Sequence, residues 1–500
     1  MSETQQMAPR VLFGNWIRQE SSGIKGASAA GSTVLVAGMG VAGVLLVAAG
    51  PLAGLVAAFL VVAVFSATTT PVRRLGQRVG FLVQRARGEH QWRSGVFSRN
   101  QERESRLPGM LGGVELLEKA DAFGVHGEQF AVLHNPRVGG LYTVVAKCIA
   151  DGPWMQDQTQ VDLWVASYAN VLSALGHDHA IICAKAITET APDPGGRLAA
   201  MVGAGRVAGA PAVARGIIDQ VVAAAPATSS ENVTYLELTF RGRTLDRKGR
   251  RDVILSELAR RVPGVRGRLE AAGGGAVTMV TANELPGIVR AAYDPEAQVF
   301  LERAALAGSG PTAVDWKDAG PVSYQEAWDH LLHDSGRSVT WEMAEAPRQS
   351  LNERSLTALL APHSDFARKR VAIIYRPHTP AEAAQVSEND VDTAVFNADQ
   401  GKKRISARSR LRVKATERSR DEVALGAGMV RFSLLITATV HHRDGDLDQA
   451  VSTIEAGASS VLMRLRRSYG SQAAGFVATL PVGFVPWIHT VVPDKIRDLL

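Results

Sequence analysis

The sequence is poor in cysteine, with only Cys148 and Cys183 among its 500 residues. Two cysteines cannot build a disulfide framework, and both lie inside apolar, strand-like runs. Disordered, collagenous and fibrous classes are also excluded, because 46% of the residues are hydrophobic and 21% are charged, as in ordinary globular proteins. A reduced, cytosolic setting therefore fits most of the chain, and its length predicts two or three domains.

Charged residues are absent between Lys25 and Arg73. Within this gap, residues 33–67 form a near-continuous apolar run, which is too long for one membrane-spanning helix of about 20 residues and just enough for two short ones. Gly50 and Pro51 interrupt the run near its middle, where glycine permits a reversal and proline removes a backbone donor. The sequence therefore predicts a transmembrane helical hairpin that turns at these two residues. The alternative is a hairpin buried in the core of a soluble protein.

Small residues four positions apart occur in both parts of the apolar run, which would let the two helix backbones approach closely. These residues are Gly38, Ala42, Gly54 and Ala58. The residues that flank the run are basic on both sides, which places both ends of the chain and its bulk in the cytoplasm. The basic residues before the run are Arg10, Arg18 and Lys25, and those after it are Arg73, Arg74, Arg78, Arg85 and Arg87. The expected location is therefore the cytoplasmic (inner) membrane, in a multi-pass topology.

The segment after the apolar run is rich in arginine, with apolar residues 81–83 interleaved. This pattern predicts an amphipathic juxtamembrane helix whose arginines bind anionic lipid headgroups. A solvated linker is the alternative. The polar residues 1–32 form a cytoplasmic N-terminal segment, and residues 68–106 form the basic juxtamembrane linker.

From residue 107 onward the pattern is that of an α+β fold. Strand-length, β-branched runs alternate with segments of helical spacing. The expected elements include helices at 157–175, 213–224 and 380–396 and strands at 142–150, 180–188, 233–240 and 370–376. This order favours ferredoxin-like α/β sandwich domains, with a parallel doubly wound sheet as the second choice. The predicted borders are a first cytosolic domain at 107–295, a connecting region at 296–367 and a second cytosolic domain at 368–500.

Motifs that carry chemistry are missing. No Gly-x4-Gly-Lys-Ser/Thr sequence occurs, so we expect no ATP hydrolysis by this chain, and no GxSxG or SxxK nucleophile motif is present. Neither cysteine has the electropositive, exposed setting of a nucleophile. We therefore predict no catalytic residue, no cofactor and no enzymatic activity.

Two clusters, one acidic and one with histidines, are candidate metal sites. Asp444, Asp446 and Asp448 resemble the start of a calcium loop, but Gln449 occupies the position where such a loop needs glycine, so a helix N-terminus fits better. His330 and His333 could share a helix face, yet no third ligand lies nearby. We therefore predict no metal site.

A basic run lies between residues 401 and 420, with nine lysines or arginines and one acidic residue. Its candidate partner-docking residues are Lys402, Lys403, Arg404, Arg408, Arg410, Arg412 and Lys414. Aromatic residues for base stacking are absent from the run, so an electrostatic docking face for a partner is the favoured functional interpretation. The alternatives are a solvated helix, contact with lipid headgroups, and an adaptor that contacts DNA.

Several short motifs, spread from about residue 14 to 485, resemble one family. They are Gly14-Asn15-Trp16, Leu107-Pro108-Gly109, YTVV at 142–145, Asp162-x-Trp164-Val165, ETAPDPG at 189–195, Trp328-Asp329-His330 and Tyr469-Gly470-Ser471-Gln472. Together they resemble actinobacterial membrane proteins encoded beside a type IV secretion-like ATPase in integrative conjugative elements. The resemblance supplies no catalytic residues.

The resemblance implies a role in conjugative DNA transfer. The hairpin is similar to the two-helix inner-membrane subunit of type IV secretion, and the remainder resembles the N-terminal, non-motor domain of the secretion ATPase. The stretch from Arg464 to Gly483 is similar to the one that precedes the motor, but no motor follows here. The implied function is a structural component that tethers a separate ATPase to inner-membrane channel subunits, as a homo-oligomer. A type VII secretion membrane subunit and a membrane-tethered enzyme are the rival hypotheses.

Overall fold

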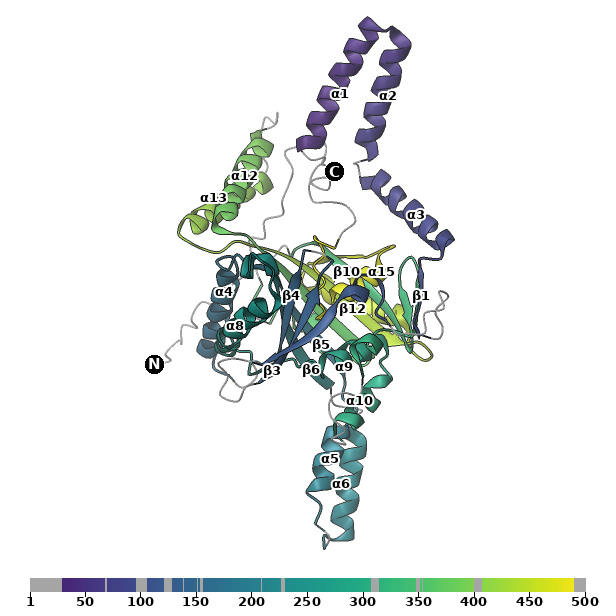
Figure 1. The fold of residues 1–500 in the computed structure, drawn as a ribbon, viewed down its shortest axis with the longest axis vertical. Coiled ribbons are helices and arrows are strands. Elements are labelled where there is room, and N and C mark those ends of the chain that lie inside the picture. Colours follow the sequence, from purple (N-terminus) through teal and green to yellow (C-terminus); the bar gives the residue numbers. More distant parts are fainter. Residues whose placement is uncertain are drawn as a thin grey trace, which may run out of the picture. The chain divides into compact units, whose positions relative to one another are not determined.

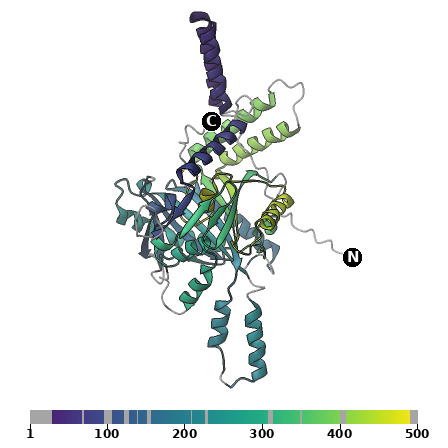
Figure 2. The same ribbon diagram turned by 90° about the vertical axis from the view of Figure 1, so that its right-hand side faces the viewer.

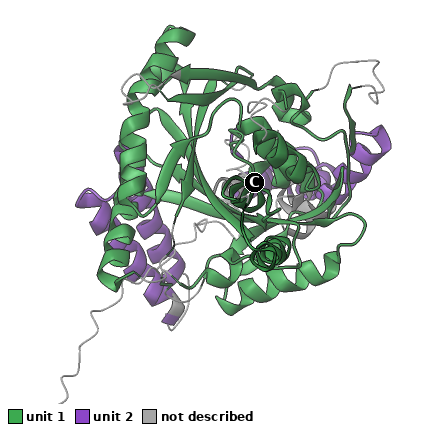
Figure 3. Ribbon diagram, turned by 90° about the horizontal axis from the view of Figure 1, so that it is seen from below, with its two compact units in different colours: residues 1–14, 91–379, 428–485 green, residues 15–90, 380–427, 486–500 purple. Residues whose placement is uncertain are grey.

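The computed structural model describes residues 29–489, except 68–69, 96–105, 121–127, 138, 151, 153–155, 208, 226–229, 307–313, 348–350, 353 and 400–406. The chain divides into two units by its internal contacts (Figure 3). One unit comprises residues 1–14, 91–379 and 428–485, and the other comprises residues 15–90, 380–427 and 486–500. The predicted N-terminal segment 1–32 lies almost entirely outside the described residues.

The described part of the second unit is mainly helical. Its helices are α1 (Ala29–Ala48), α2 (Pro51–Ala67), α3 (Thr70–Arg87), α12 (Pro380–Asp399) and α13 (Ala407–Ala424) (Figure 1). α1 and α2 pack against each other, as do α12 and α13. The chain reverses between α1 and α2 at Gly50, whose φ of +94° lies in the region that favours glycine.

The transmembrane assignment of residues 33–67 is not supported. Within the part of the chain that the structure describes, no helix has both the length and the apolar composition that a membrane crossing requires. α2 has 17 residues, and α1, with 20, begins with five small residues, Ala-Ala-Gly-Ser-Thr. A crossing helix needs about 20 predominantly apolar residues.

The first unit is built on one antiparallel sheet, so the α+β class is confirmed. In the described residues this sheet has 13 strands, in the order β1-β8-β9-β10-β12-β11-β5-β6-β4-β3-β2, with β13 on β10 and β7 on β4. The strands are β1 (Gln91–Arg93), β2 (Glu115–Ala120), β3 (Gln129–Asn135), β4 (Leu141–Ile149), β5 (Ile181–Pro192), β6 (Ser230–Arg241), β7 (Ala276–Met279), β8 (Ser323–Glu326), β9 (Leu331–His333), β10 (Gly336–Glu345), β11 (Arg368–Pro377), β12 (Val430–His441) and β13 (Arg464–Arg467). The parallel sheet kept as the second choice is therefore excluded.

The sheet consists of two halves with the same order of elements. The first half runs β4, α4 (Gln158–Leu175), β5, β6, α8 (Arg251–Ala271), β7, and the second runs β10, α11 (Thr357–Leu360), β11, β12, α14 (Leu447–Ser460), β13. Their strand orders are β7-β4-β6-β5 and β13-β10-β12-β11, and every pairing is antiparallel. Each half is thus a β-α-β-β-α-β unit in which the third strand lies between the first two.

The side chains confirm that the two halves correspond. Thr143 is the third residue of β4 and pairs with Thr239, the third residue from the end of β6. Ser338 is the third residue of β10 and pairs with Thr439, the third residue from the end of β12. The hydroxyls of these two pairs are hydrogen-bonded at 2.9 and 2.7 Å. The molecule therefore contains an internal structural repeat.

The two regions predicted as separate cytosolic domains contribute to the same sheet. β5 of the first half pairs with β11 of the second over seven residues, so the two halves share one continuous sheet. The region 296–367, predicted as a connection, contributes β8, β9 and β10. Edge strands such as β5 and β11 satisfy their outward backbone groups by pairing with each other, which a sequence pattern cannot show.

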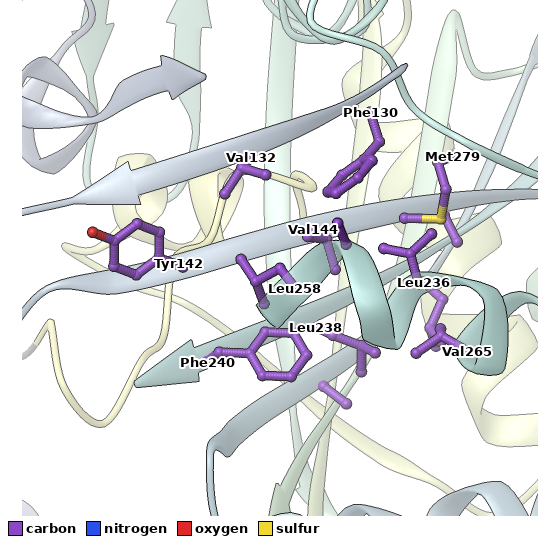
Figure 4. Close-up of a cluster of buried hydrophobic side chains, with 14 of the residues drawn as sticks. Phe130, Val132, Tyr142, Val144, Leu236, Leu238, Phe240, Leu258, Val265 and Met279 are labelled. Carbon is purple, nitrogen blue, oxygen red and sulfur yellow. The ribbon is translucent and has the colours of Figure 1, made fainter. Parts of the chain in front are cut away.

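Apolar cores lie on both faces of the sheet. Alternate residues of β4 and β6, together with α8, form the core of the first half, which includes Phe130, Val144, Leu238 and Leu258 (Figure 4). The core of the second half involves β10, β12 and α14. A third core, on the opposite face of β4, holds α9 (Leu285–Tyr293) and α15 (Gln472–Ala478).

Each half carries a pair of helices inserted between its second and third strands. α5 (Gly196–Ala204) and α6 (Ala212–Ala224) connect β5 to β6, and α12 and α13 connect β11 to β12. Figures 1 and 2 show α5 and α6 side by side, projecting from the sheet. α10 (Ala297–Leu306) contacts α5. The described residues also form the short helix α7 (Gly242–Leu245) and 3-10 turns at Gly109–Gly113 and Trp316–Asp318.

Candidate functional surfaces

The α1–α2 pair is closely packed at small residues. A Cβ atom added at Gly38 would lie 2.8 Å from both Cγ atoms of Val61, so only glycine fits without a shift. Ala42 is buried and Ala58 is half-buried. Gly54 lies on α2, but its surroundings are outside the described part of the structure. The structure therefore brings Gly38 and Ala42 to the contact between the helices.

The outer surface of the same pair is apolar. Large hydrophobic side chains on α1 and α2 are 47–84% exposed: Val36, Val41, Val44, Leu46, Val47, Leu52, Leu55, Val56 and Phe59. Monomeric soluble proteins rarely expose contiguous apolar patches of this kind, which usually mark a membrane or protein contact. We call these nine residues the apolar hairpin surface.

α3 follows as a basic, amphipathic helix. Arg78, Arg85 and Arg87 are exposed, and Val79 and Leu82 are also exposed at helical spacing. Arg73 and Arg74 lie on the same helix, but their side chains are outside the description. Arg87 approaches Glu89 at only 4.0 Å, with both groups in solvent. Such an exposed pair contributes little, so the cationic face remains accessible to anions.

The predicted docking run is the helix α13, and the structure gives it a neighbour of opposite charge. Lys402, Lys403 and Arg404 lie outside the described residues, as does the side chain of Arg408. Arg410 and Lys414 are exposed, and Arg412 is half-buried. α12, which packs against α13, carries five acidic residues and no basic one: Glu382, Glu388, Asp390, Asp392 and Asp399.

The end of α13 also holds its own acidic partners. Arg418 pairs with Glu422 at 3.0 Å, and Arg420 lies 3.4 Å from Asp421. Part of the positive charge predicted to meet a partner is therefore balanced within the α12–α13 pair. Arg410 and Lys414 remain the described cations of the candidate set that face solvent.

The clusters weighed as metal sites serve structural purposes. The Asp446 carboxylate accepts hydrogen bonds from the backbone N–H groups of Asp448 and Gln449 at 2.9 and 3.0 Å, which is the capping geometry of a helix N-terminus. His330 and His333 do not share a helix, because β9 and its flanking turns occupy this segment. The described residues contain no group of three metal-ligating side chains.

His333 and the two cysteines are buried. Burial lowers the pKa of His333 to about 4, and its imidazole bridges the carbonyl of Tyr293 and the hydroxyl of Ser338. Burial also raises the pKa of Cys148 to about 11. Neither thiol is therefore set up as a nucleophile at neutral pH.

A buried row of polar side chains, which no sequence motif predicts, crosses the centre of the sheet. It lies on the face that carries α9 and α15, and we call it the polar stripe. Its members are Thr143, Lys185, Glu189, Glu237, Thr239, Ser338, Thr340, Arg370, Thr437 and Thr439, all of them buried. The sequence signal for this stripe is a single charged residue within an apolar strand run, such as Lys185 in AIICAKAIT, because a buried charge needs a partner.

The polar stripe is held by the segment that follows α15. The backbone N–H of Gly483 donates to Glu237 at 3.0 Å, and the hydroxyl of Thr479 donates to Thr437 at 3.0 Å. One short segment thus hydrogen-bonds to both halves of the sheet. This arrangement supports a rigid body, and no residue of the stripe is exposed to a substrate.

No protein-family model matches the chain, and no curated protein sequence is significantly similar to it.

Proposed function

We propose that this protein is a membrane-attached structural component of a type IV secretion-like, conjugative DNA-transfer machine. In this role, a homo-oligomer of the chain tethers a separate ATPase to the inner-membrane channel subunits. The proposal combines the family resemblance of the sequence motifs with the surfaces of α1, α2 and α3. The role is one of attachment and docking rather than of catalysis.

The observation that carries the membrane part of the proposal is the apolar hairpin surface directly followed by a basic helix. Residues such as Val47, Leu52 and Phe59 are 73–84% exposed, and burying each in acyl chains is worth about 1.5–3 kcal/mol. The arginines of α3 add electrostatic attraction to anionic headgroups. Attachment requires the hairpin to contact acyl chains and does not require either helix to cross the bilayer. The basic residues of α3 favour the cytoplasmic side.

Vesicle flotation of the full-length protein tests this attachment. We expect the chain to float with vesicles that contain phosphatidylglycerol and to bind zwitterionic vesicles more weakly. Replacing Arg78, Arg85 and Arg87 together by glutamate removes three cations, each worth about 1 kcal/mol at an anionic surface. The affinity for anionic vesicles should fall about 100-fold or more.

A matched variant controls for the change in net charge. Arg243, Arg247 and Lys248 are exposed in the first unit and can be replaced by glutamate in the same number. This control should float like the unchanged protein. Equal losses in both variants, or no flotation of the unchanged protein, would contradict attachment through α1–α3.

The docking part of the proposal rests on the exposed cations of α13. In detergent, the full-length protein should retain an ATPase encoded beside it. Replacing Arg410 and Lys414 by glutamate should weaken that retention at low salt, because exposed charge pairs govern encounter and are screened by ions. Replacing Arg247 and Lys248 instead should leave retention unchanged. If the α13 variant loses DNA rather than the ATPase, the DNA-adaptor hypothesis replaces docking.

A further inference from the structure

The helices α5 and α6 form a second exposed apolar surface. Six large hydrophobic residues on them and on their connection are 44–75% exposed: Met201, Val207, Val213, Ile217, Ile218 and Val221. None of the described residues of either helix is buried. Figure 2 shows the pair projecting beyond the rest of its unit. The α5–α6 pair therefore has no hydrophobic core of its own.

The corresponding insertion in the second half behaves differently. α12 occupies the same position, between the second and third strands of its half, and packs against α13. It buries five residues: Ala383, Ser387, Val391, Ala394 and Ala398. α12 thus buries part of its apolar side although Val395 and Phe396 stay exposed, whereas neither α5 nor α6 buries any described residue.

The length of α5 and α6 shows that they need a covering surface. They have 9 and 13 residues, and helices shorter than about 12–15 residues are marginal in water without tertiary packing. They are also too short to cross a bilayer, which takes about 20 residues. α5 follows strand β5 and α6 precedes strand β6, so no basic helix such as α3 adjoins the pair to hold it at an anionic lipid surface. We therefore take a protein surface as the cover.

The charges on the pair indicate what that surface is. Two of the three arginines of the pair and its connection are neutralised locally: Arg206 forms an ion pair with Asp219, and Arg197 pairs with Glu231 at 3.1 Å and lies 3.7 Å from Glu302. The third, Arg215, is exposed on α6 and lies two residues from Val213 and Ile217, on the opposite side of the helix from them. Because the remaining cation lies away from the face of Val213, Ile217 and Val221, two identical apolar faces can meet without repulsion, and no partner of opposite charge is called for. Two helical hairpins can bury their apolar faces against each other by forming a four-helix bundle.

We propose that α5 and α6 dock on the α5–α6 pair of a second copy of this chain, forming a four-helix bundle about a two-fold axis. Such an interface is self-complementary, because the same patch serves both subunits. The inference deepens the homo-oligomeric part of the proposed function and rests on it. It does not depend on lipid or on the ATPase.

Disulfide cross-linking of the full-length protein tests the interface. Cys148 and Cys183 are buried, so one introduced cysteine supplies the accessible thiol. Val213→Cys, Ile217→Cys and Val221→Cys follow one face of α6 at spacings of four residues. Near a two-fold axis, a residue lies close to its own copy, so at least one of the three variants should form a covalent dimer under mild oxidation. Val395→Cys, which is similarly exposed on α12, should not.

Self-association in detergent provides a second test if oxidation forms no disulfide. Ile217→Asp places a charge in the bundle and should weaken self-association in detergent at least tenfold, as measured by sedimentation. Val395→Asp is the matched control and should leave association unchanged. Unaltered circular dichroism and melting temperature of both variants would show that the body remains folded, as expected for residues outside the core.

Three results would overturn the interface. The chain could sediment as a monomer at every concentration, the three cysteine variants could all stay monomeric while a dimer persists, or Ile217→Asp could leave the dimer intact. Thiols at these positions that become shielded from a water-soluble maleimide only when vesicles are added would also overturn it, in favour of lipid. Failed flotation with intact cross-linking would instead refute only the membrane attachment.

Discussion

In the first half of the sheet, the centre of the polar stripe is an ion pair, whereas in the second half an arginine occupies the corresponding place and donates to a threonine hydroxyl. Lys185 pairs with Glu237 at 3.0 Å, and both side chains are fully buried. At the same place in the second half, Arg370 lies opposite Thr437 and donates from Nε to the hydroxyl of Thr479 at 3.3 Å. The two halves thus have polar side chains at equivalent positions, but the charged residues among them differ.

This difference has consequences for the cation in each half. Burial lowers the pKa of Arg370 to about 10, and its nearest carboxylate, that of Glu189, lies 3.7 Å away on β5 of the other half. Arg368 also binds Glu189. The first half therefore neutralises its buried cation internally, and the second half borrows a carboxylate across the β5–β11 pairing. Because the second half relies on a carboxylate of the first, the two halves are not independent folding units.

The helices over the two halves differ as well. α4 has 18 residues, whereas α11, at the equivalent position, has four. The second half instead places the residues Leu351 and Phe366, from the chain on either side of α11, in its core. The first half therefore has a full helix at this position, whereas the second half has a single helical turn and irregular chain.

The largest expected effect comes from breaking the buried ion pair. Glu237→Ala leaves Lys185 buried without its carboxylate, which should lower the free energy of unfolding by about 3–5 kcal/mol. Thr437→Ala, at the equivalent place, removes only neutral hydrogen bonds and should cost about 1 kcal/mol. Denaturant titration of the full-length protein measures both. Equal costs would contradict the assigned difference between the halves.

A double variant sharpens the same test. Lys185→Met combined with Glu237→Leu removes both charges and fills their space with apolar groups. Because such replacements are often neutral, the double variant should regain most of the stability that Glu237→Ala loses. A double variant as unstable as the single one would show that the loss comes from the Gly483 contact instead.

One pH dependence should be specific to the second half. Burial lowers the pKa of His333 from its ordinary 6.5 to about 4, so between these values the unfolded chain binds a proton that the folded chain does not. Stability should therefore fall as the pH drops from 6.5 to 4, by up to about 3 kcal/mol. Asn135 stands at the equivalent position of the first half, paired with Leu141 as His333 is paired with Gly336. The variant His333→Asn should remove this part of the pH dependence, as followed by unfolding at several pH values.

A smaller effect is expected where the C-terminal segment crosses the stripe. Gly483 has a φ of +73°, and an added Cβ would lie 2.7 Å from the hydroxyl oxygen of Thr143. Gly139 has the same φ in open space. Gly139→Ala should cost about 1 kcal/mol through backbone strain, and Gly483→Ala about 2–3 kcal/mol because crowding adds to it. Similar melting temperatures for the two variants would show that the segment yields easily.

The regular elements were predictable where local periodicity was strong. The helix expected at 157–175 is observed at Gln158–Leu175, and the one expected at 213–224 is observed at Ala212–Ala224. The strand expected at 370–376 is observed at Arg368–Pro377. In contrast, the short strands β8 and β9 were missed, because three or four residues are too few to establish a period of two.

The candidate surfaces were predictable in part. The charge gap located α1 and α2, and the small residues located the contact at Gly38, because both signals are local in sequence. The polar stripe was not foreseen, since Lys185 and Glu237 lie on different strands and only their pairing reveals that each is neutralised. For the same reason, the sequence did not predict that the acidic residues of α12 lie beside the basic residues of α13. An acidic and a basic segment can each be recognised alone, but their proximity cannot.

The amino-acid sequence alone determined the α+β class, the apolar N-terminal pair with its turn at Gly50, and the absence of a phosphate-binding loop, because each depends on neighbouring residues and on local conformational preference. Only the tertiary structure decided that two halves repeat one another, that they join through β5 and β11 into one sheet, and that a buried polar stripe links them. These features arise from backbone hydrogen bonds and side-chain pairs between residues about 50 to 250 positions apart, and such pairings leave no periodic trace along the chain.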